Sequence, residues 1–290
     1  MNFSNGLIVP LLTPFNSDFS IDKIAFKSNI ARLMNRGVRN FFVLSKFGEQ
    51  EFLDLEKEKE VIRIAADNIG RKDNFFVGCF SQSTDEMISK IKFAQKYTDN
   101  CVINVPYLAL TNEVEFVDFF DTIFTKTNAN IFLLNDPVIF KRNIPIVGLN
   151  RIANWEKFLG VFDFSKNPVY FSAVSDYHQS FSVFQGIEEL AVESFNRKCA
   201  GLVLAAANVV PEYFLNIKND FFNSGYNSLI RDELKILTLM KESFADKKIQ
   251  LYKKILSEEG IMQEYFSKEL PALSDSELKI AESFVTKVFS

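Results

Sequence analysis

The chain has 290 residues and a mass of 33.3 kDa, which is more than one average domain and fits a single α/β barrel with an appendage. Apolar residues make up 47% and charged residues 24% of the chain, which excludes wholesale disorder. With 33 basic and 37 acidic side chains the net charge is −4, so we expect no nucleic-acid partner.

The N-terminal residues MNFSNGLIVPLLTPF contain no basic region, and two prolines interrupt their apolar stretch. We therefore expect no signal peptide and no membrane-spanning segment. Cys79, Cys101 and Cys199 lie far apart without a CxxC pair, and His178 is the only histidine. This pattern argues against a disulfide framework and a metal site, and it favours a cytoplasmic location.

Short apolar runs rich in β-branched and aromatic residues recur along the chain. Each is too short for a buried helix and nearly continuous in apolar character, which is typical of a parallel strand covered on both faces. Eight strands are predicted: Gly6–Thr13, Asn40–Ser45, Asn74–Phe80, Cys101–Pro106, Ala129–Asn135, Leu159–Ser165, Ser180–Gln185 and Ala200–Ala206.

Segments with helical spacing separate these strands. The first, Ile21–Arg36, places Ile24, Ala31 and Leu33–Met34 near one stripe, and we expect Gly37 to be its C-cap. Three pairs of residues have the spacing of capping boxes, which mark helix starts. The first two predict helices that begin at Thr84 and Glu113, and the third predicts a last helix that runs through Phe289. These pairs are Ser83 with Glu86, Asn112 with Glu115, and Ser274 with Glu277.

Eight βα units in a row predict a (β/α)8 TIM barrel, followed by a C-terminal helical appendage. We expect the barrel to span residues 1–215 and the helical segment, packed on the barrel, to span residues 216–290. Phenylalanine is unusually frequent, with 32 residues. Either it replaces other apolar residues in the core, or some of it recognises an aromatic ligand.

Function in such a barrel lies at the carboxyl ends of the strands. Five of these ends read NGLIVPLLTPF, GVRNFFVLSKFGEQEFLDLEKEK, IFLLNDP, LGVFDFS and AGLVLAAANVVPE. Together with the C-terminal segment YKKILSEEGIMQEYFSKELPALSDSE, they resemble the family of dihydrodipicolinate synthase, N-acetylneuraminate lyase and 2-keto-3-deoxygluconate aldolase. The resemblance covers essentially the whole chain. It implies lyase chemistry in which a sixth-strand lysine forms a Schiff base with a keto acid, tyrosines relay protons, and no cofactor takes part.

The positions that would carry this chemistry are changed. The sixth-strand pattern Gly-Ile-Lys-Asp-Ser-Ser has Phe162 at the lysine, and the fifth-strand pattern Tyr-Asn-x-Pro has Leu134 at the tyrosine. The carboxylate-binding pattern Gly-Thr-Thr-Gly-Glu after the second strand is replaced by Ser45-Lys46-Phe47-Gly48-Glu49, and Leu108 stands at the other relay tyrosine. An arginine expected after Pro137 is missing. The residues that are retained are mostly turn or packing positions: Gly37, Gly48, Glu49, Asn135, Pro137, Asp163, Gly201, Asn208 and Pro211.

Lys46 is a candidate to replace the missing amine, because the second and sixth strands of an eight-stranded barrel are diametrically opposed. It could be a relocated Schiff-base lysine desolvated by neighbouring rings, a simple anion-binding charge, or the structural partner of an acid such as Glu49. We take Lys46 as the candidate catalytic residue. The candidate substrate-binding residues are Ser45, Phe47, Tyr107, Leu134, Phe162 and Phe164.

Three functional hypotheses follow. The chain is a pseudo-enzyme that binds a small molecule without the parent aldolase activity, an active lyase with a site rebuilt around Lys46, or a structural partner of a catalytic paralogue. We expect a 2-keto acid or related ligand, weak pyruvate affinity in a site lined by phenylalanine, and a preference for a larger, less polar molecule. We also expect a homo-oligomer, a dimer or a tetramer, without metal or cofactor.

Overall fold

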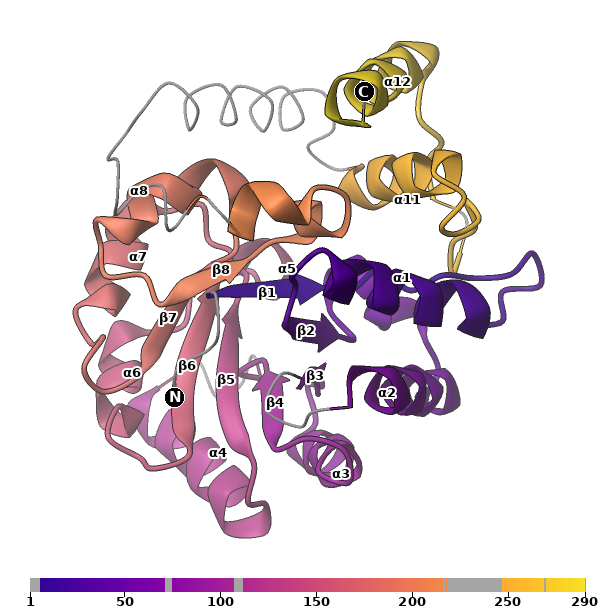
Figure 1. Cartoon of the computed structure of the whole chain (residues 1–290). Helices are drawn as coiled ribbons and strands as arrows, with labels where there is room; N and C mark the ends of the chain where they lie inside the picture. Colours follow the sequence, from indigo (N-terminus) through magenta and orange to yellow (C-terminus); the bar gives the residue numbers. More distant parts are fainter. Residues whose placement is uncertain are drawn as a thin grey trace. The chain divides into compact units, whose positions relative to one another are not determined.

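The chain folds into a (β/α)8 barrel, in which strands β1 to β8 close into one sheet in sequence order (Figure 1). The structure is a computed structural model and describes residues 6–70, 75–106, 112–215, 217, 247–268 and 270–289. The predicted fold class and all eight predicted strands are confirmed. The strands are β1 (Leu7–Pro10), β2 (Asn40–Val43), β3 (Phe75–Gly78), β4 (Asn100–Ile103), β5 (Asn130–Asn135), β6 (Phe158–Asp163), β7 (Ser182–Gln185) and β8 (Gly201–Val203).

Helices alternate with the strands and continue beyond the last one. Among the described residues, no helix combines the length and the apolar composition needed to cross a bilayer. The α-helices are α1 (Lys23–Asn35), α2 (Leu55–Ile69), α3 (Thr84–Ala94), α4 (Glu113–Lys126), α5 (Pro137–Phe140), α6 (Ile146–Ile152), α7 (Pro168–Ser175), α8 (Ala191–Phe195), α11 (Lys248–Glu258) and α12 (Asp275–Phe289).

The predicted helix starts are confirmed by their caps. The side chains of Ser83 and Asn112 accept hydrogen bonds from the backbone N–H groups of Glu86 and Glu115, at the starts of α3 and α4. At α12 the capping box is reciprocal, because Ser274 Oγ accepts from Glu277 N while Glu277 Oε2 accepts from Ser274 N at 2.6 Å. Each of these bonds satisfies a backbone donor that a helix start leaves unpaired.

The predicted apolar stripe of α1 is wrong in part. Ile24 is 80% exposed and Ala31 is also exposed, whereas the buried face consists of Ala25, Phe26, Asn29, Ile30 and Leu33. The helix begins at Lys23 rather than Ile21, because the side chain of Asp22 caps it by accepting from Ala25 N. Gly37 follows the helix at φ 95°, as expected for the glycine that ends it.

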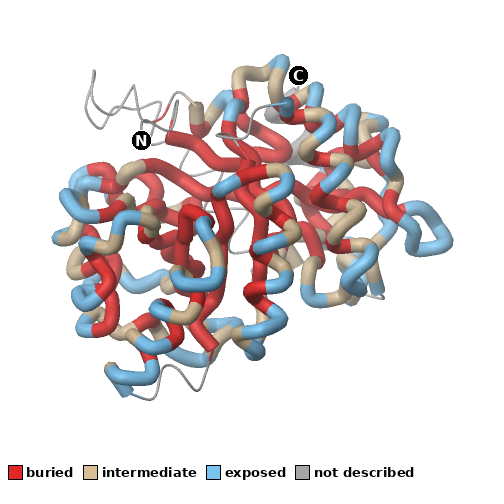
Figure 2. Tube along the Cα trace, turned by 90° about the horizontal axis from the view of Figure 1, so that it is seen from below, coloured by how far each residue is buried: buried red, intermediate tan, exposed pale blue. Residues whose placement is uncertain are grey.

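The strands are buried along almost their whole length, while exposed residues concentrate on the helices and loops (Figure 2). Phenylalanine fills much of this interior: among the described residues, the largest fully buried side chains are all phenylalanine except Tyr252. The high phenylalanine content is therefore mainly a property of the core, which is the first of the two interpretations above.

Two compact units make up the chain. The first unit consists of residues 1–8 and 71–204, and the second of residues 9–70 and 205–290. The carboxyl ends of β5 and β6 belong to the first unit. The turn after β2 and the C-terminal helices belong to the second. The predicted boundary at residue 215 stays a prediction.

Candidate functional site

The first unit carries the positions at which the resemblance expects the nucleophile and a proton relay. Leu134 on β5 and Phe162 on β6 are register partners in the parallel ladder. The side chain of Phe162 is fully buried, and that of Leu134 is 4% exposed. Neither side chain carries a nitrogen or oxygen atom, so this pair of positions holds no group that attacks a carbonyl or moves a proton.

The Phe162 ring is part of an aromatic cluster. Its centroid lies 5.1 Å from that of Phe184 on β7, 5.5 Å from Phe132 on β5 and 5.8 Å from Phe76 on β3. A β6 side chain that meets rings from both neighbouring strands and from β3 points into the barrel, where inward side chains of different strands pack in layers. The position of the expected amine is therefore the centre of a hydrocarbon core.

Glycines make room for two of the rings beside this position. A Cβ atom on Gly160 would lie 2.6 Å from the carbonyl oxygen of Ser182 and 3.0 Å from the Phe132 ring. A Cβ atom on Gly186 would lie 2.6 Å from the Phe164 ring, which is itself buried. These two phenylalanines pack directly on glycine backbone, so the interior is shaped to hold large rings.

A polar network lies at the same strand ends, on the residues next to Phe162 and Leu134. Asn135 Nδ2 donates to Asp163 Oδ1 at 2.7 Å and to Asn143 Oδ1 at 3.0 Å, while Asn135 Oδ1 accepts from Ile144 N at 2.9 Å. Tyr170 on α7 donates its hydroxyl to the carbonyl oxygen of Ile144 at 2.8 Å. The network fastens the chain after α5 to β5 and α7.

Asp163 is the charged member of this network and is buried. Its carboxylate also accepts from Ser165 N at 3.1 Å and Ser165 Oγ at 3.0 Å. Burial raises the pKa of Asp163 to about 6, although the hydrogen bonds from Asn135 and Ser165 oppose the rise. Burial also raises the pKa of Tyr170, and the nearby Asp163 adds to that rise. Tyr170 is therefore a neutral donor here.

The second unit carries the turn after β2. Ser45 is buried and caps a short 3₁₀ helix, Lys46–Gly48, by accepting from Gly48 N. Lys46 is partly exposed, and its Nζ lies 5.2 Å from the centroid of the Phe47 ring. Thr13 Oγ1 donates to the carbonyl oxygen of Gly48 at 2.9 Å, which ties the turn to the chain that follows β1.

Glu49 closes this turn with a buried ion pair that the sequence did not predict. Lys253 on α11 places Nζ 2.5 Å from Glu49 Oε1, and both side chains are fully buried. Glu49 Oε2 accepts from the backbone N–H and from the hydroxyl of Ser267, each at 2.7 Å. Lys253 also donates to the carbonyl oxygen of Tyr265 at 2.7 Å. One of the roles considered for Lys46 is a structural ion pair with an acid such as Glu49. The lysine bound to Glu49 is Lys253.

The described candidate residues thus form two clusters, one in each unit. Leu134, Phe162 and Phe164 lie together on β5 and β6 and just beyond β6, and all three are buried. Ser45, Lys46 and Phe47 lie together in the turn after β2. Tyr107 and Leu108 lie outside the described residues.

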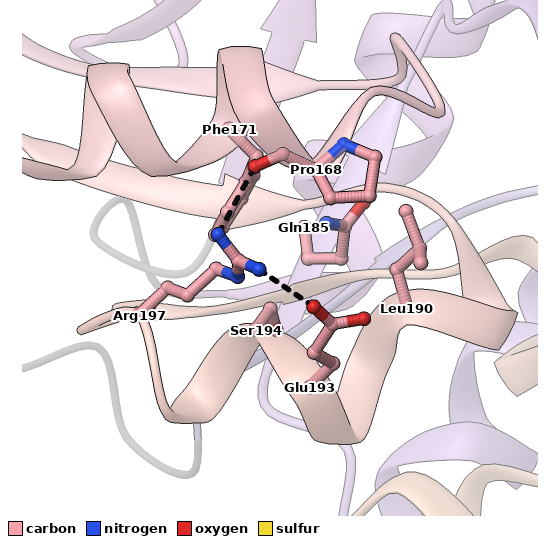
Figure 3. Close-up of a pocket in the computed structure, with 7 residues that line it drawn as sticks. All are labelled: Pro168, Phe171, Gln185, Leu190, Glu193, Ser194 and Arg197. Carbon is pink, nitrogen blue, oxygen red and sulfur yellow. Dashed lines mark hydrogen bonds and ion pairs between the residues drawn. The ribbon is translucent and has the colours of Figure 1, made fainter.

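A small hollow of the first unit lies elsewhere, between α7 and α8 (Figure 3). Its volume of about 10 Å³ is far smaller than that of usual small-molecule sites. Arg197 crosses it, donating to the carbonyl oxygen of Pro168 at 3.3 Å and to Glu193 Oε1 at 2.8 Å (Figure 3). No candidate site residue is among those that line it, which are Pro168, Phe171, Gln185, Leu190, Glu193, Ser194 and Arg197.

Comparisons with known proteins agree with this architecture. The sequence model of the dihydrodipicolinate synthetase family matches residues 3–287. An uncharacterized DapA-like lyase of Pyrococcus horikoshii is 28% identical over 241 residues, which cover 81% of this chain and 83% of that protein. The 4-hydroxy-tetrahydrodipicolinate synthase of Methanothermobacter thermautotrophicus is 21% identical, with 83% and 87% covered. The structure of dihydrodipicolinate synthase from Bacteroides thetaiotaomicron superposes with a TM-score of 0.89 at 25% identity, covering 99% of this chain and all of that one.

Proposed function

Because the chain belongs to the dihydrodipicolinate synthetase family, we propose that it is a member of that family without imine chemistry, a pseudo-enzyme that binds a small molecule. The observation that carries this proposal is the burial of Phe162 among Phe76, Phe132 and Phe184. An imine needs an unprotonated amine that can reach a carbonyl carbon. A benzyl side chain packed on three rings provides neither the amine nor the space.

The rest of the first unit supports the same conclusion. None of its described lysines is buried, so none of these amines lies in the core. Leu134 removes the relay hydroxyl from the neighbouring strand, and Asp163 and Asn135 are engaged in the network that holds the strand ends. Retention of this network together with loss of the reactive groups fits a protein that keeps the scaffold for binding.

Lys46 gives the alternative, an active lyase with a rebuilt site. Lys46 is partly exposed and its amine lies near the Phe47 ring, in the turn where the family pattern binds a carboxylate. A cation in that position suits an anionic ligand as well as it suits a nucleophile. The two roles differ in one measurable property, since only the nucleophile forms a reducible covalent bond with a keto acid.

The deciding experiment is borohydride trapping followed by intact-mass spectrometry. The protein is incubated with pyruvate or with 2-keto-3-deoxygluconate, next to a dihydrodipicolinate synthase that has its lysine. We expect the synthase to gain a reduced adduct and this protein to gain none. An adduct that is lost in Lys46→Met would establish the rebuilt lyase, and an adduct at any other lysine would equally overturn the proposal.

Binding without turnover is the positive half of the proposal. A ligand that binds the native state raises the melting temperature to an extent set by the ratio of its concentration to its Kd. We expect a saturable rise with a 2-keto acid or a larger, less polar carboxylate, reduced in Lys46→Met. We also propose that the protein is cytoplasmic and works as a homo-oligomer, and light scattering on the purified chain tests its oligomeric state.

A further inference from the structure

The buried carboxylate of Glu49, in the turn after β2, is bound by residues of the C-terminal segment. We propose that Lys253 is a positioning residue that acts through Glu49 to set the conformation of the turn that carries Ser45, Lys46 and Phe47. The inference rests on the proposed function only in taking this turn as part of the ligand site.

The hydrogen bonds at this charge connect three separate segments. Glu49 belongs to the turn, Lys253 to α11, and Tyr265 and Ser267 to the chain between α11 and α12. Both carboxylate oxygens of Glu49 are used, one by Lys253 and the other by Ser267. The Lys253 ammonium also lies 4.6 Å from the ring centroid of Phe15 and 4.9 Å from that of Phe266, so aromatic faces complete its surroundings.

Stability alone does not account for this ion pair. Two fully buried charges lose their hydration, and the attraction between them often fails to repay that loss. Burial lowers the pKa of Lys253 to about 8 in spite of the adjacent Glu49, so desolvation outweighs the attraction for this ammonium. A pair of this kind is better suited to selecting one arrangement of the segments that it joins.

The arrangement selected at Glu49 is an unusual one. Glu49 has φ 58°, a left-handed conformation that is unfavourable for a residue with a Cβ atom. Its N–H donates to the carbonyl oxygen of Lys46, and the next N–H, that of Gln50, donates to the carbonyl oxygen of Ser45. If the Glu49 carboxylate were released, the strain would relax and both of these bonds would be lost. The side chains of Lys46 and Phe47 would then move with the turn.

Amide hydrogen exchange on the full chain tests this coupling. The reporters are the amides of Glu49 and Gln50 in the turn and Ser267 in the C-terminal segment, with the amides of Cys79 and Phe164 in the first unit as references. In Lys253→Met we expect exchange at the three reporters to accelerate together by about 100-fold or more, because Glu49 is left buried and unpaired. The reference amides should change by less than about threefold.

Lys254→Met is the matched control. Lys254 is the next residue on α11, but it forms partly exposed ion pairs with Glu258 and Glu264 at 3.2 and 3.8 Å. We expect this variant to change every amide by less than about threefold. Equal acceleration at reporters and references in Lys253→Met, or acceleration at Ser267 with an unchanged turn, would overturn the proposal.

Two further measurements test the proposal if Lys253→Met folds poorly. Ser267→Ala removes one hydrogen bond to Glu49 and buries no unpaired charge, and we expect about tenfold faster exchange at Glu49 and Gln50. Unchanged rates there would overturn the positioning role. In the unmodified protein, protection of these two amides should fall between about pH 7 and pH 9 as Lys253 loses its proton, and the absence of this fall would count equally against it. None of these readouts uses a ligand, so a failure of the proposed function is distinguished from a failure of this inference.

Discussion

Leu134 and Phe162 are register partners on the adjacent strands β5 and β6, so the two positions at which the resemblance expects a relay tyrosine and a nucleophile are neighbours in the barrel wall. A nucleophile and its proton relay work only as neighbours, because the proton must move as the carbonyl bond changes. The side chains at both positions are hydrocarbon and carry no group for either role. Predictions about this unit therefore concern its packing as much as its chemistry.

The first prediction concerns the lysine that the family pattern would place at residue 162. Phe162→Lys is expected to lower the free energy of unfolding by at least about 4 kcal/mol, because it places an unpaired ammonium among three rings. Phe162→Leu, which keeps an apolar side chain, should cost only about 1 kcal/mol. Urea unfolding at pH 7 measures both. A Phe162→Lys protein as stable as the unmodified one would show that the core is more open than these ring contacts imply.

The second prediction concerns the contact between Gly186 and the Phe164 ring. Gly186→Ala should destabilise the protein by about 1–3 kcal/mol, because the added methyl group would lie 2.6 Å from that ring. Replacing the ring in the double variant Gly186→Ala/Phe164→Leu should recover part of the loss. A double-mutant cycle on unfolding free energies measures the coupling, and strictly additive effects would rule out the direct contact.

The third prediction is a pH dependence due to Asp163. Its pKa is about 6 in the fold and 3.8 in the unfolded chain, so the folded protein holds the extra proton between these values. The stabilisation from that proton is complete below about pH 4 and is lost as the pH rises through 6, a change of about 3 kcal/mol. Asp163→Asn has no such titration and can still accept from Asn135. Urea unfolding of both proteins at pH 4 and pH 7 checks this, and parallel changes in the two would contradict it.

The fourth prediction concerns the capping box of α12. Ser274→Ala removes the hydroxyl that accepts from Glu277 N, and should cost about 1 kcal/mol. Ser274→Thr keeps a hydroxyl and should cost much less. The loss is measured as faster amide exchange in the first turn of α12. A helix start that is equally protected in both variants would show that the hydrogen bond from Lys247 to Glu277 holds it without the cap.

The fold was predictable from sequence because its signals are local. Apolar runs of strand length marked the eight strands, and pairs such as Ser83 with Glu86 marked helix starts through bonds that span three residues. The α1 stripe failed because Ile24 lies on the solvent side, opposite to Phe26 and Ile30, and a single apolar residue at a helix start carries little directional information.

The candidate site was predictable only where a sequence pattern fixed the strand position. That pattern placed Leu134 and Phe162 on neighbouring strands, which the register confirms. The ion pair between Glu49 and Lys253 was not predictable, because it joins residues 204 positions apart. In the segment Lys248–Glu258, Lys253 is one of three lysines on a helix with polar and apolar faces, and no local signal distinguishes it from the two that are partly exposed. Only the tertiary fold shows which of them is buried.

The ring-filled interior of the first unit also bears on how this chain can change in evolution. A single substitution that introduces an amine at residue 162 must pass through a protein with a buried, unpaired charge, and one that first removes a neighbouring ring leaves a cavity. Either step uses a large fraction of the roughly 5–15 kcal/mol that typically separates a folded domain from its unfolded state. Selection acts on each intermediate, so the packing hinders the introduction of an amine at residue 162. From this sequence, substitutions at the barrel rim are closer in mutational distance than a lysine at residue 162.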